Sequence, residues 1–164
     1  MASSAHASYA SSDPERIPLL GTLPTPAALE AAFAPLILSA SGWRKVFSES
    51  GDEESLSPEI GDANRILAAL MADVFADYLI AHKIEKDLIL GRDARPTGEE
   101  MADAMCRVFL ARGIRVRYLG ISAAPEIMAY ARGHGSFAYV SASHNPIGHN
   151  GVKFGLSDGG VLEG

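Results

Sequence analysis

The sequence contains little of what marks a secreted or membrane-bound protein. Its single cysteine, Cys106, excludes an intrachain disulfide and fits a reducing compartment. Its most apolar long stretch, residues 66–81, is interrupted by Asp73 and Asp77, so we expect no membrane span. The N-terminus lacks a basic region followed by an apolar one, and so it does not resemble a secretory signal. We therefore expect a cytoplasmic protein.

Positive charge is also scarce, with 14 Lys and Arg against 20 Asp and Glu and a net charge of −6 at pH 7. This balance disfavours nucleic acid as a partner, because phosphate backbones are bound by clustered basic side chains. Neither a GxGxxG nor a Walker A sequence occurs, so these two nucleotide-binding loops have no support. Small anionic ligands are compatible with the charge, since they need only a few local arginines and lysines.

The chain is long enough for one domain with a hydrophobic core. It has 164 residues, of which 48% are hydrophobic and 21% charged, as in ordinary globular proteins. The N-terminal end is different, being rich in Ala and Ser and poor in large apolar side chains, so it cannot offset its ordering entropy. We predict a disordered tail at residues 1–17 and one domain at residues 18–164.

Strand-like and helix-like patterns alternate through the domain. Short apolar runs predict strands at residues 36–38, 43–47, 87–90, 116–120, 137–140 and 152–156. Apolar residues at helical spacing predict helices at residues 58–82, 97–112 and 125–132. Ser57-Pro58 favours a helix start at that point, and Thr97 could cap the second helix. The alternation predicts an α/β fold, a three-layer sandwich with a mixed, mostly parallel sheet and helices on both faces.

A polar stretch, Ser141 to Lys153, follows the predicted strand at 137–140. Its Asn-Pro and Asn-Gly pairs favour turns, so we expect a loop at the edge of the sheet where α/β proteins bind ligands. The stretch contains a hydroxyl at Ser143, an imidazole at His144 and an ammonium at Lys153, a set suited to nucleophilic or phosphoryl chemistry. By composition alone, an ordinary surface loop would fit equally well.

The order of residues is more specific than their composition. Ala-Ser-His-Asn-Pro followed by Asn-Gly-x-Lys resembles the active-site serine loop of the α-D-phosphohexomutases, the phosphoglucomutases and phosphomannomutases. Ser-Gly-Trp-Arg at residues 41–44 resembles the family's first motif, with Lys45 where the family has Gly. Gly-x-Asp-x-Arg from Gly91 resembles the second motif. The resemblance runs from Leu36 to the end and implies the first domain of the family.

The resemblance implies a role for each matching residue. The catalytic residues would be Ser143, His144, Lys153 and Arg44. Phosphate or substrate would be bound by Arg44, Asn145 and Lys153. The loop would be supported by Asp93, Arg95, Asn150 and Gly151. Ser143 would carry the phosphoryl group and also bind the metal, whereas Ser141 stands where the family more often has Thr.

The implied activity is the interconversion of hexose 1-phosphate and 6-phosphate through a phosphoserine and a bisphosphorylated sugar. Its partners would be these hexose phosphates, the hexose bisphosphate and the remaining domains of the same enzyme. Mg²⁺ would be shared with an acidic loop that this chain lacks, so the chain alone should be inactive. Because it ends at Gly164, where a further helix should cover the sheet, we expect a domain truncated at its C-terminus.

Three other interpretations stay open at this point. The chain could be a non-catalytic sugar-phosphate-binding or interaction module that retains the loop. A serine hydrolase using Ser143 and a histidine is weaker, because no Gly-x-Ser-x-Gly elbow is present. A metal site at His144 and His149 is weaker still, because the sequence offers no fixed third ligand.

Overall fold

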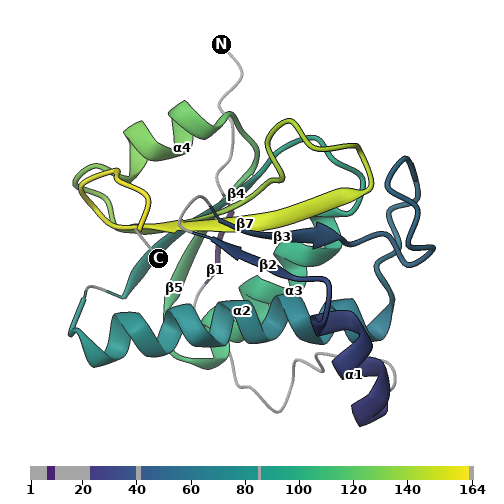
Figure 1. Cartoon of the computed structure of the whole chain (residues 1–164). Helices are drawn as coiled ribbons and strands as arrows, with labels where there is room; N and C mark the ends of the chain where they lie inside the picture. Colours follow the sequence, from purple (N-terminus) through teal and green to yellow (C-terminus); the bar gives the residue numbers. More distant parts are fainter. Residues whose placement is uncertain (1–6, 10–22, 40–41, 85, 163–164) are drawn as a thin grey trace.

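The structure, a computed structural model, describes residues 7–9, 23–39, 42–84 and 86–162. A seven-stranded sheet forms its centre, in the order β1-β5-β4-β6-β7-β3-β2 (Figure 1). The strands are β1 (Ala7–Tyr9), β2 (Ile37–Ser39), β3 (Gly42–Val46), β4 (Asp87–Arg92), β5 (Arg115–Ile121), β6 (Ser136–Val140) and β7 (His149–Gly155).

The sheet is mixed, and its parallel part lies at the centre. β4 pairs in parallel with β5 and β6, and the pairs β1–β5, β6–β7, β7–β3 and β3–β2 are antiparallel. The α/β class is confirmed, but among the described strands parallel pairing is less extensive than predicted. The connections explain the difference. Helices join β4 to β5 and β5 to β6, whereas the short connections of β2 to β3 and β6 to β7 suit antiparallel neighbours.

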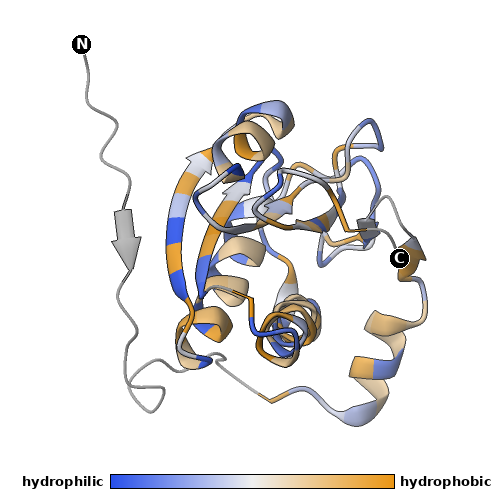
Figure 2. Cartoon of the chain, turned by 90° about the vertical axis from the view of Figure 1, so that its left-hand side faces the viewer, coloured by the Kyte–Doolittle hydropathy of each residue, from blue (hydrophilic) through white to orange (hydrophobic). Residues whose placement is uncertain are grey.

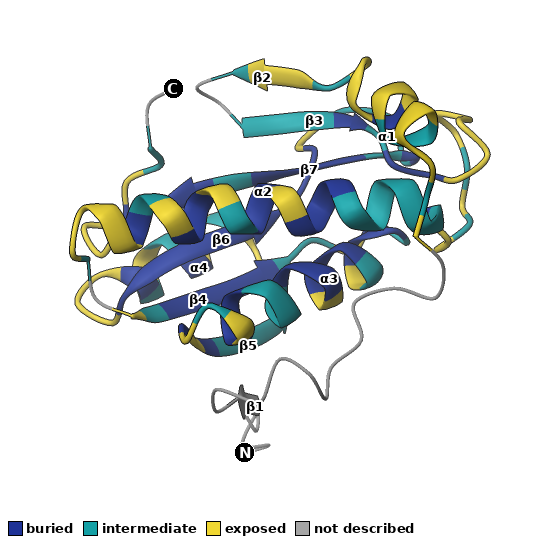
Figure 3. Cartoon of the chain, turned by 90° about the horizontal axis from the view of Figure 1, so that it is seen from below, coloured by how far each residue is buried: buried dark blue, intermediate teal, exposed yellow. Residues whose placement is uncertain are grey.

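Helices cover both faces of the sheet, as predicted. They are α1 (Pro26–Phe33), α2 (Gly61–Ala81), α3 (Gly98–Ala111) and α4 (Ala124–Ala131). α2 and α3 lie side by side on one face and α4 lies on the other (Figures 1 and 3). Figure 2 shows strands with hydrophobic residues between these two helical layers. The larger core packs α2 and α3 against the sheet, and a smaller one packs Ile127 of α4 against Phe137 and Tyr139.

Two predicted helix starts are wrong in detail. α2 begins at Gly61 rather than Pro58, because Gly61 has a left-handed φ of 70° that separates residues 58–60 from the helix. Thr97 precedes α3 but makes no capping bond, and its backbone is already in the helical region. Its hydroxyl instead accepts a hydrogen bond from Asn150, so tertiary contact has replaced the local cap.

The predicted loop is shorter than expected, since β7 already begins at His149. Asn150, Gly151 and Lys153 therefore lie on a strand and not in a turn. Gly151 suits this place because a β-carbon there would lie 2.2 Å from the carbonyl oxygen of Trp43 on β3. After β7 the chain turns back and forms one isolated antiparallel bridge, between Gly155 and Val161.

Most of the predicted tail lies outside the described residues. Within residues 1–17, the structure describes Ala7–Tyr9, as the strand β1 beside β5. The disorder of the tail and the proposed domain limits therefore stay predictions. In the part of the chain that the structure describes, no helix has the length and apolarity needed to cross a bilayer.

Candidate functional site

The serine loop, residues 141–148, connects β6 to β7 at the carboxyl end of β6. Ser143 is exposed and has a left-handed φ of 57°, which among the described non-glycine residues is shared with Lys83 alone. Its backbone N–H donates to the hydroxyl oxygen of Ser141 at 3.0 Å, which stabilises this turn. Its own hydroxyl lies 3.4 Å from Nδ1 of His144. Such backbone conformations in non-glycine residues cluster at functional sites.

A cavity of about 150 Å³ opens beside this serine. It is lined by Gly42, Trp43, Arg44, Ser141, Ala142, Ser143, His144, Asn145 and Lys153. The structure thus brings together residues from three places in the chain, β3, the serine loop and β7. In register, Arg44 lies opposite Gly151, and Lys153 lies opposite Tyr139, whose ring packs toward α4. Two cationic side chains and a hydroxyl therefore line one cavity on the α4 face of the sheet.

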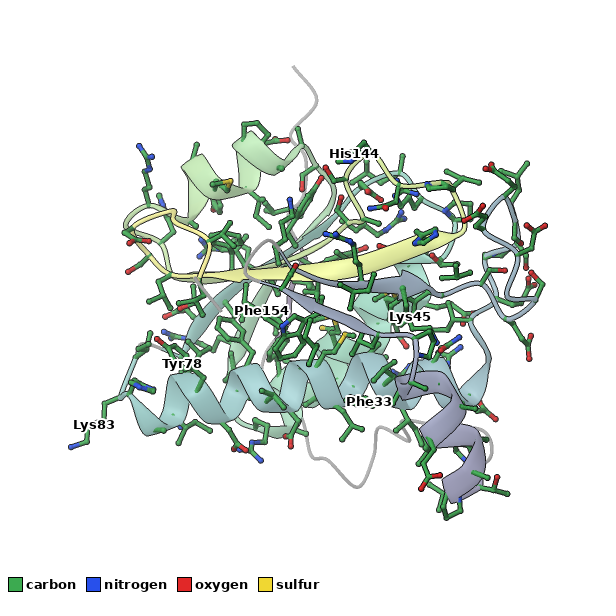
Figure 4. The ribbon with its side chains drawn as sticks, in the orientation of Figure 1. Phe33, Lys45, Tyr78, Lys83, His144 and Phe154 are labelled. Carbon is green, nitrogen blue, oxygen red and sulfur yellow. The ribbon has the colours of Figure 1, made fainter. Side chains whose placement is uncertain are left out.

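A second cavity, of about 200 Å³, lies near α2. Its lining is mainly apolar and includes Val74, Tyr78 and Phe154, of which the last two are labelled in Figure 4. It contains none of the nucleophilic, titratable or cationic residues predicted for the site. The chemistry predicted from the sequence therefore belongs to the cavity beside Ser143.

Arg95 fixes the serine loop through hydrogen bonds to its backbone. The side chain is buried, and its guanidinium donates to four carbonyl oxygens, those of Ser143, Asn145 and Pro146 in the loop and that of His149 at the start of β7. Asp93 orients Arg95, because one carboxylate oxygen lies 3.3 Å from Arg95 Nε and the other accepts from its backbone N–H at 3.0 Å. A planar guanidinium with five donors suits such divergent contacts. The path of the loop is therefore tied to the end of β4.

Asn150 ties the other end of the loop to α3. Its side chain is fully buried and donates to the hydroxyl of Thr97 at 3.0 Å. Its side-chain oxygen accepts from the N–H of Gly151 at 2.9 Å. Asn150 and Gly151 contact the framework of the loop, and neither lines the cavity.

His149 does not share the cavity with His144. Its Nε2 lies 3.4 Å from a carboxylate oxygen of Glu53. The described residues hold no group of three His, Cys, Asp or Glu side chains able to bind a metal. The geometry therefore gives the His144/His149 metal pair no third ligand.

The sequence motifs assign no supporting role to Ser141, which lines the cavity, or to Tyr139, which lies outside its lining. The contact of Ser141 has a local signal, because Ser-x-Ser is a pattern typical of a hydroxyl that binds a backbone N–H two residues on. Tyr139 was treated as a strand residue. Burial, with the charges of Asp93 and Glu126 adding to it, raises the pKa of Tyr139, so its phenol stays protonated and donates to the carbonyl of Ser122.

Comparison with known proteins identifies the family of this fold and loop. The family model for phosphoglucomutase/phosphomannomutase, alpha/beta/alpha domain I, matches residues 36–164. The chain belongs to this family. The resemblance stated from the three sequence motifs is thereby confirmed, and all three motifs lie within the matched residues.

Relatives and a solved structure agree with the family. Phosphoglucosamine mutases from Staphylococcus aureus strains JH9 and Newman are each 38% identical to the chain over 90 residues, which is 52% of this chain and 20% of the relative. The chain thus spans about a fifth of the length of these curated relatives. The crystal structure of a phosphoglucomutase/phosphomannomutase family protein from Burkholderia thailandensis matches with a TM-score of 0.61 and 23% identity. That match covers 77% of this chain and 27% of the other, and it supports the fold.

Proposed function

We propose that this chain is the serine-bearing domain of a phosphohexomutase that interconverts hexose 1-phosphate and hexose 6-phosphate. The observation that supports it most is the cavity shared by the Ser143 hydroxyl, Arg44 and Lys153. A phosphoserine carries roughly −1.5 to −2 charges at neutral pH and needs cationic partners. Both cations come from strands, which position side chains more rigidly than loops do.

In the proposed reaction, Ser143 Oγ carries the phosphoryl group. A sugar hydroxyl oxygen forms a new bond to phosphorus, and the bond from phosphorus to Ser143 Oγ breaks. The hydroxyl proton goes to a base in the cavity, and an acid in the cavity gives a proton to the departing Ser143 Oγ, so that the free serine hydroxyl is restored. His144 and Lys153 are the candidates for these two transfers, and whichever acts as base must be neutral when it accepts the proton. The bisphosphorylated sugar then returns its other phosphoryl group to Ser143. Arg44 offsets the charge on the phosphoryl oxygens throughout, and Lys153 does so in its ammonium form.

The supporting residues act through the shape of the loop. Asn145 lines the cavity and would contact phosphate through its side-chain amide, which also donates to the carbonyl of Ala142 at 2.6 Å. Arg95 engages the carbonyl oxygens of Ser143 and Asn145, whose partial negative charge would otherwise oppose a bound phosphate. We assign Asp93, Asn150 and Gly151 to supporting the loop through their contacts with Arg95, Thr97 and β3.

Mg²⁺ would neutralise charge on the phosphoryl group when it is bound. The ligand contributed by this chain would be an oxygen on phosphorylated Ser143, with the other ligands supplied by further parts of the enzyme. The chain alone should therefore not convert hexose phosphates at an appreciable rate. We place the enzyme in the cytoplasm, where its phosphorylated sugars would be retained.

The test uses the enzyme at its natural length, purified from its own cells. A radiolabelled hexose bisphosphate should transfer label to the protein, and Ser143→Ala should abolish labelling and lower turnover by roughly 10³-fold or more, as for other nucleophiles. Ser141→Ala, the matched control, should retain labelling, because it removes a turn-stabilising acceptor and not the carrier. Turnover near normal in Ser143→Ala would refute the proposal. Hexose phosphate binding without label on any serine would favour the non-catalytic binding module.

A further inference from the structure

Lys45 is a buried lysine that the proposed chemistry does not use. It follows Arg44 on β3, and because neighbouring strand residues point to opposite faces, its side chain lies away from the cavity. Only 7% of the residue is exposed. Its ammonium donates to the carbonyl oxygen of Ala32 and to the side-chain oxygen of Asn64, each at 2.7 Å. Both acceptors are uncharged, and burial lowers the pKa of Lys45.

These two contacts join β3 to two helices. Ala32 lies in the last turn of α1, where a cation is favourable and where α1 has no basic residue of its own. Asn64 lies in the first turn of α2, and its amide nitrogen donates to the carbonyl oxygens of Phe47, at 3.1 Å, and Ile60, at 3.0 Å. Figure 4 shows Lys45 near the junction of β3, α1 and α2, far from Lys83 at the opposite end of α2.

The second half of β3 pairs with a neighbouring strand on one side and not on the other, among the described residues. On one side, β7 pairs with residues 43–46 of β3. On the other side, the register of β2 reaches Arg44 and goes no further along the described chain. β2 is itself a three-residue edge strand whose Ile37 and Leu38 are half exposed. Beyond Arg44, the described part of the chain pairs no strand with the outer side of β3. The side chain of Lys45 is one anchor there, beside buried Phe47, whose carbonyl oxygen accepts from Asn64.

We propose that Lys45 is a positioning residue that fixes β3 against α1 and α2 and thereby holds Arg44 in the cavity beside Ser143. The inference rests on the proposed function only for the task of Arg44. The mechanical link from Lys45 to Arg44 rests on the contacts alone.

The test measures the position of Arg44 in the 164-residue chain by NMR, with no substrate needed. Lys45→Met keeps an unbranched side chain one atom shorter and removes its donors, and Lys83→Met is the control at an exposed lysine. In Lys45→Met, the side-chain Nε–H signal of Arg44 should shift and broaden. The amide of Phe47, which donates to Gly148, should exchange roughly tenfold faster or more, as expected for loss of bonds from a charged donor. Lys83→Met should change neither.

A second pair of variants covers loss of folding. Asn64→Ala removes the side-chain acceptor of Lys45, and it also removes the bonds from the Asn64 amide nitrogen to Phe47 and Ile60. Asn64→Asp loses the same two donated bonds but keeps an acceptor for Lys45. If Lys45→Met does not fold, an Arg44 signal that shifts in Asn64→Ala and not in Asn64→Asp supports the inference, and equal shifts in both contradict it. An unchanged Arg44 signal in folded Lys45→Met, even with α1 detached, would overturn the inference, because Lys45 would then only dock α1. A phosphate titration separates the two proposals. If inorganic phosphate fails to shift the wild-type Arg44 signal, the phosphate role of Arg44 fails, whereas the link to Lys45 is judged by the variants.

Discussion

Replacement of Arg95 by Met should destabilise the whole domain as well as the serine loop. The side chain of Arg95 is 9% exposed, and its guanidinium is shared between Asp93 and the carbonyl oxygens of the loop. Methionine fills part of the volume but offers no donor. The loop carbonyls would need water in a space that the arginine now occupies, and Asp93 would lose its partner.

The expected loss follows from these contacts. A hydrogen bond to a charged group contributes about 1.5–3 kcal/mol. The bonds of Arg95 do not add, because they share one donor group and the carbonyls can partly rehydrate. Removing one member of a buried ion pair costs about 3–5 kcal/mol. The loop is near the surface, so we expect the lower end, about 3 kcal/mol, or a fall in Tm of about 10 °C for a domain of this size.

Urea unfolding followed by circular dichroism measures this loss in the free energy of unfolding. Two further variants serve as a comparison and a control. Arg95→Lys should lose nearly as much, because a single ammonium cannot reach carbonyls that a planar guanidinium spans. Arg115→Met is the control, since Arg115 is 70% exposed in its ion pair with Asp87 and should contribute less than about 1 kcal/mol. If Arg95→Met were no less stable than Arg115→Met, the loop would not depend on Arg95.

Three further predictions follow from single residues. Gly151→Ala should lower the free energy of unfolding by about 2–3 kcal/mol, because the added β-carbon meets Trp43 O at 2.2 Å. Gly98→Ala is the control and should change the free energy of unfolding little, because its β-carbon has no contact under 3.4 Å. Equal losses in the two variants would contradict this prediction. Burial raises the pKa of Cys106 to about 11, so near pH 8 its alkylation should be about 100-fold slower in the folded than in the urea-unfolded chain, and equal rates would refute the burial argument. Burial lowers the pKa of Lys45, so between that lowered pKa and 10.5 the unfolded chain binds more protons than the folded chain. The free energy of unfolding of the wild type, relative to that of Lys45→Met, should therefore rise with pH across this window. A fall with pH would show that the sign of the pKa shift is wrong.

The strands and the serine loop were predictable because their signals are local or ordered along the chain. Apolar runs located β4 and β6 within two residues, and the sequence Ala-Ser-His-Asn-Pro located the turn at Ser143. Asn150-Gly151 misled the prediction, since the same pair that favours turns here forms a strand. The buried side-chain amide of Asn150 donates a hydrogen bond to Thr97, and the absence of a β-carbon at Gly151 lets β3 pack close to β7.

Tertiary contacts were not predictable. A lysine in a strand is normally exposed, and nothing near Lys45 in the sequence indicates that Ala32 and Asn64 close over it. The spacing of Asp93 and Arg95 in the sequence is compatible with an ion pair between them. The bonds of Arg95 to carbonyl oxygens about 50 residues later instead depend on the packing of β6 and β7 beside β4. Sequence patterns identify such residues, but the fold decides what they contact.

The central claim is that Ser143 is the phosphoryl carrier, and phosphopeptide mapping tests it most directly. The protein is purified from its own cells, at the length it has there, digested and examined by peptide mass spectrometry that separates Ser141 from Ser143. Our account predicts phosphate on Ser143, because this hydroxyl lines the cavity with Arg44 and Lys153, whereas Ser141 is 8% exposed and accepts the N–H of Ser143. Phosphate on Ser141, with none on Ser143, would contradict it.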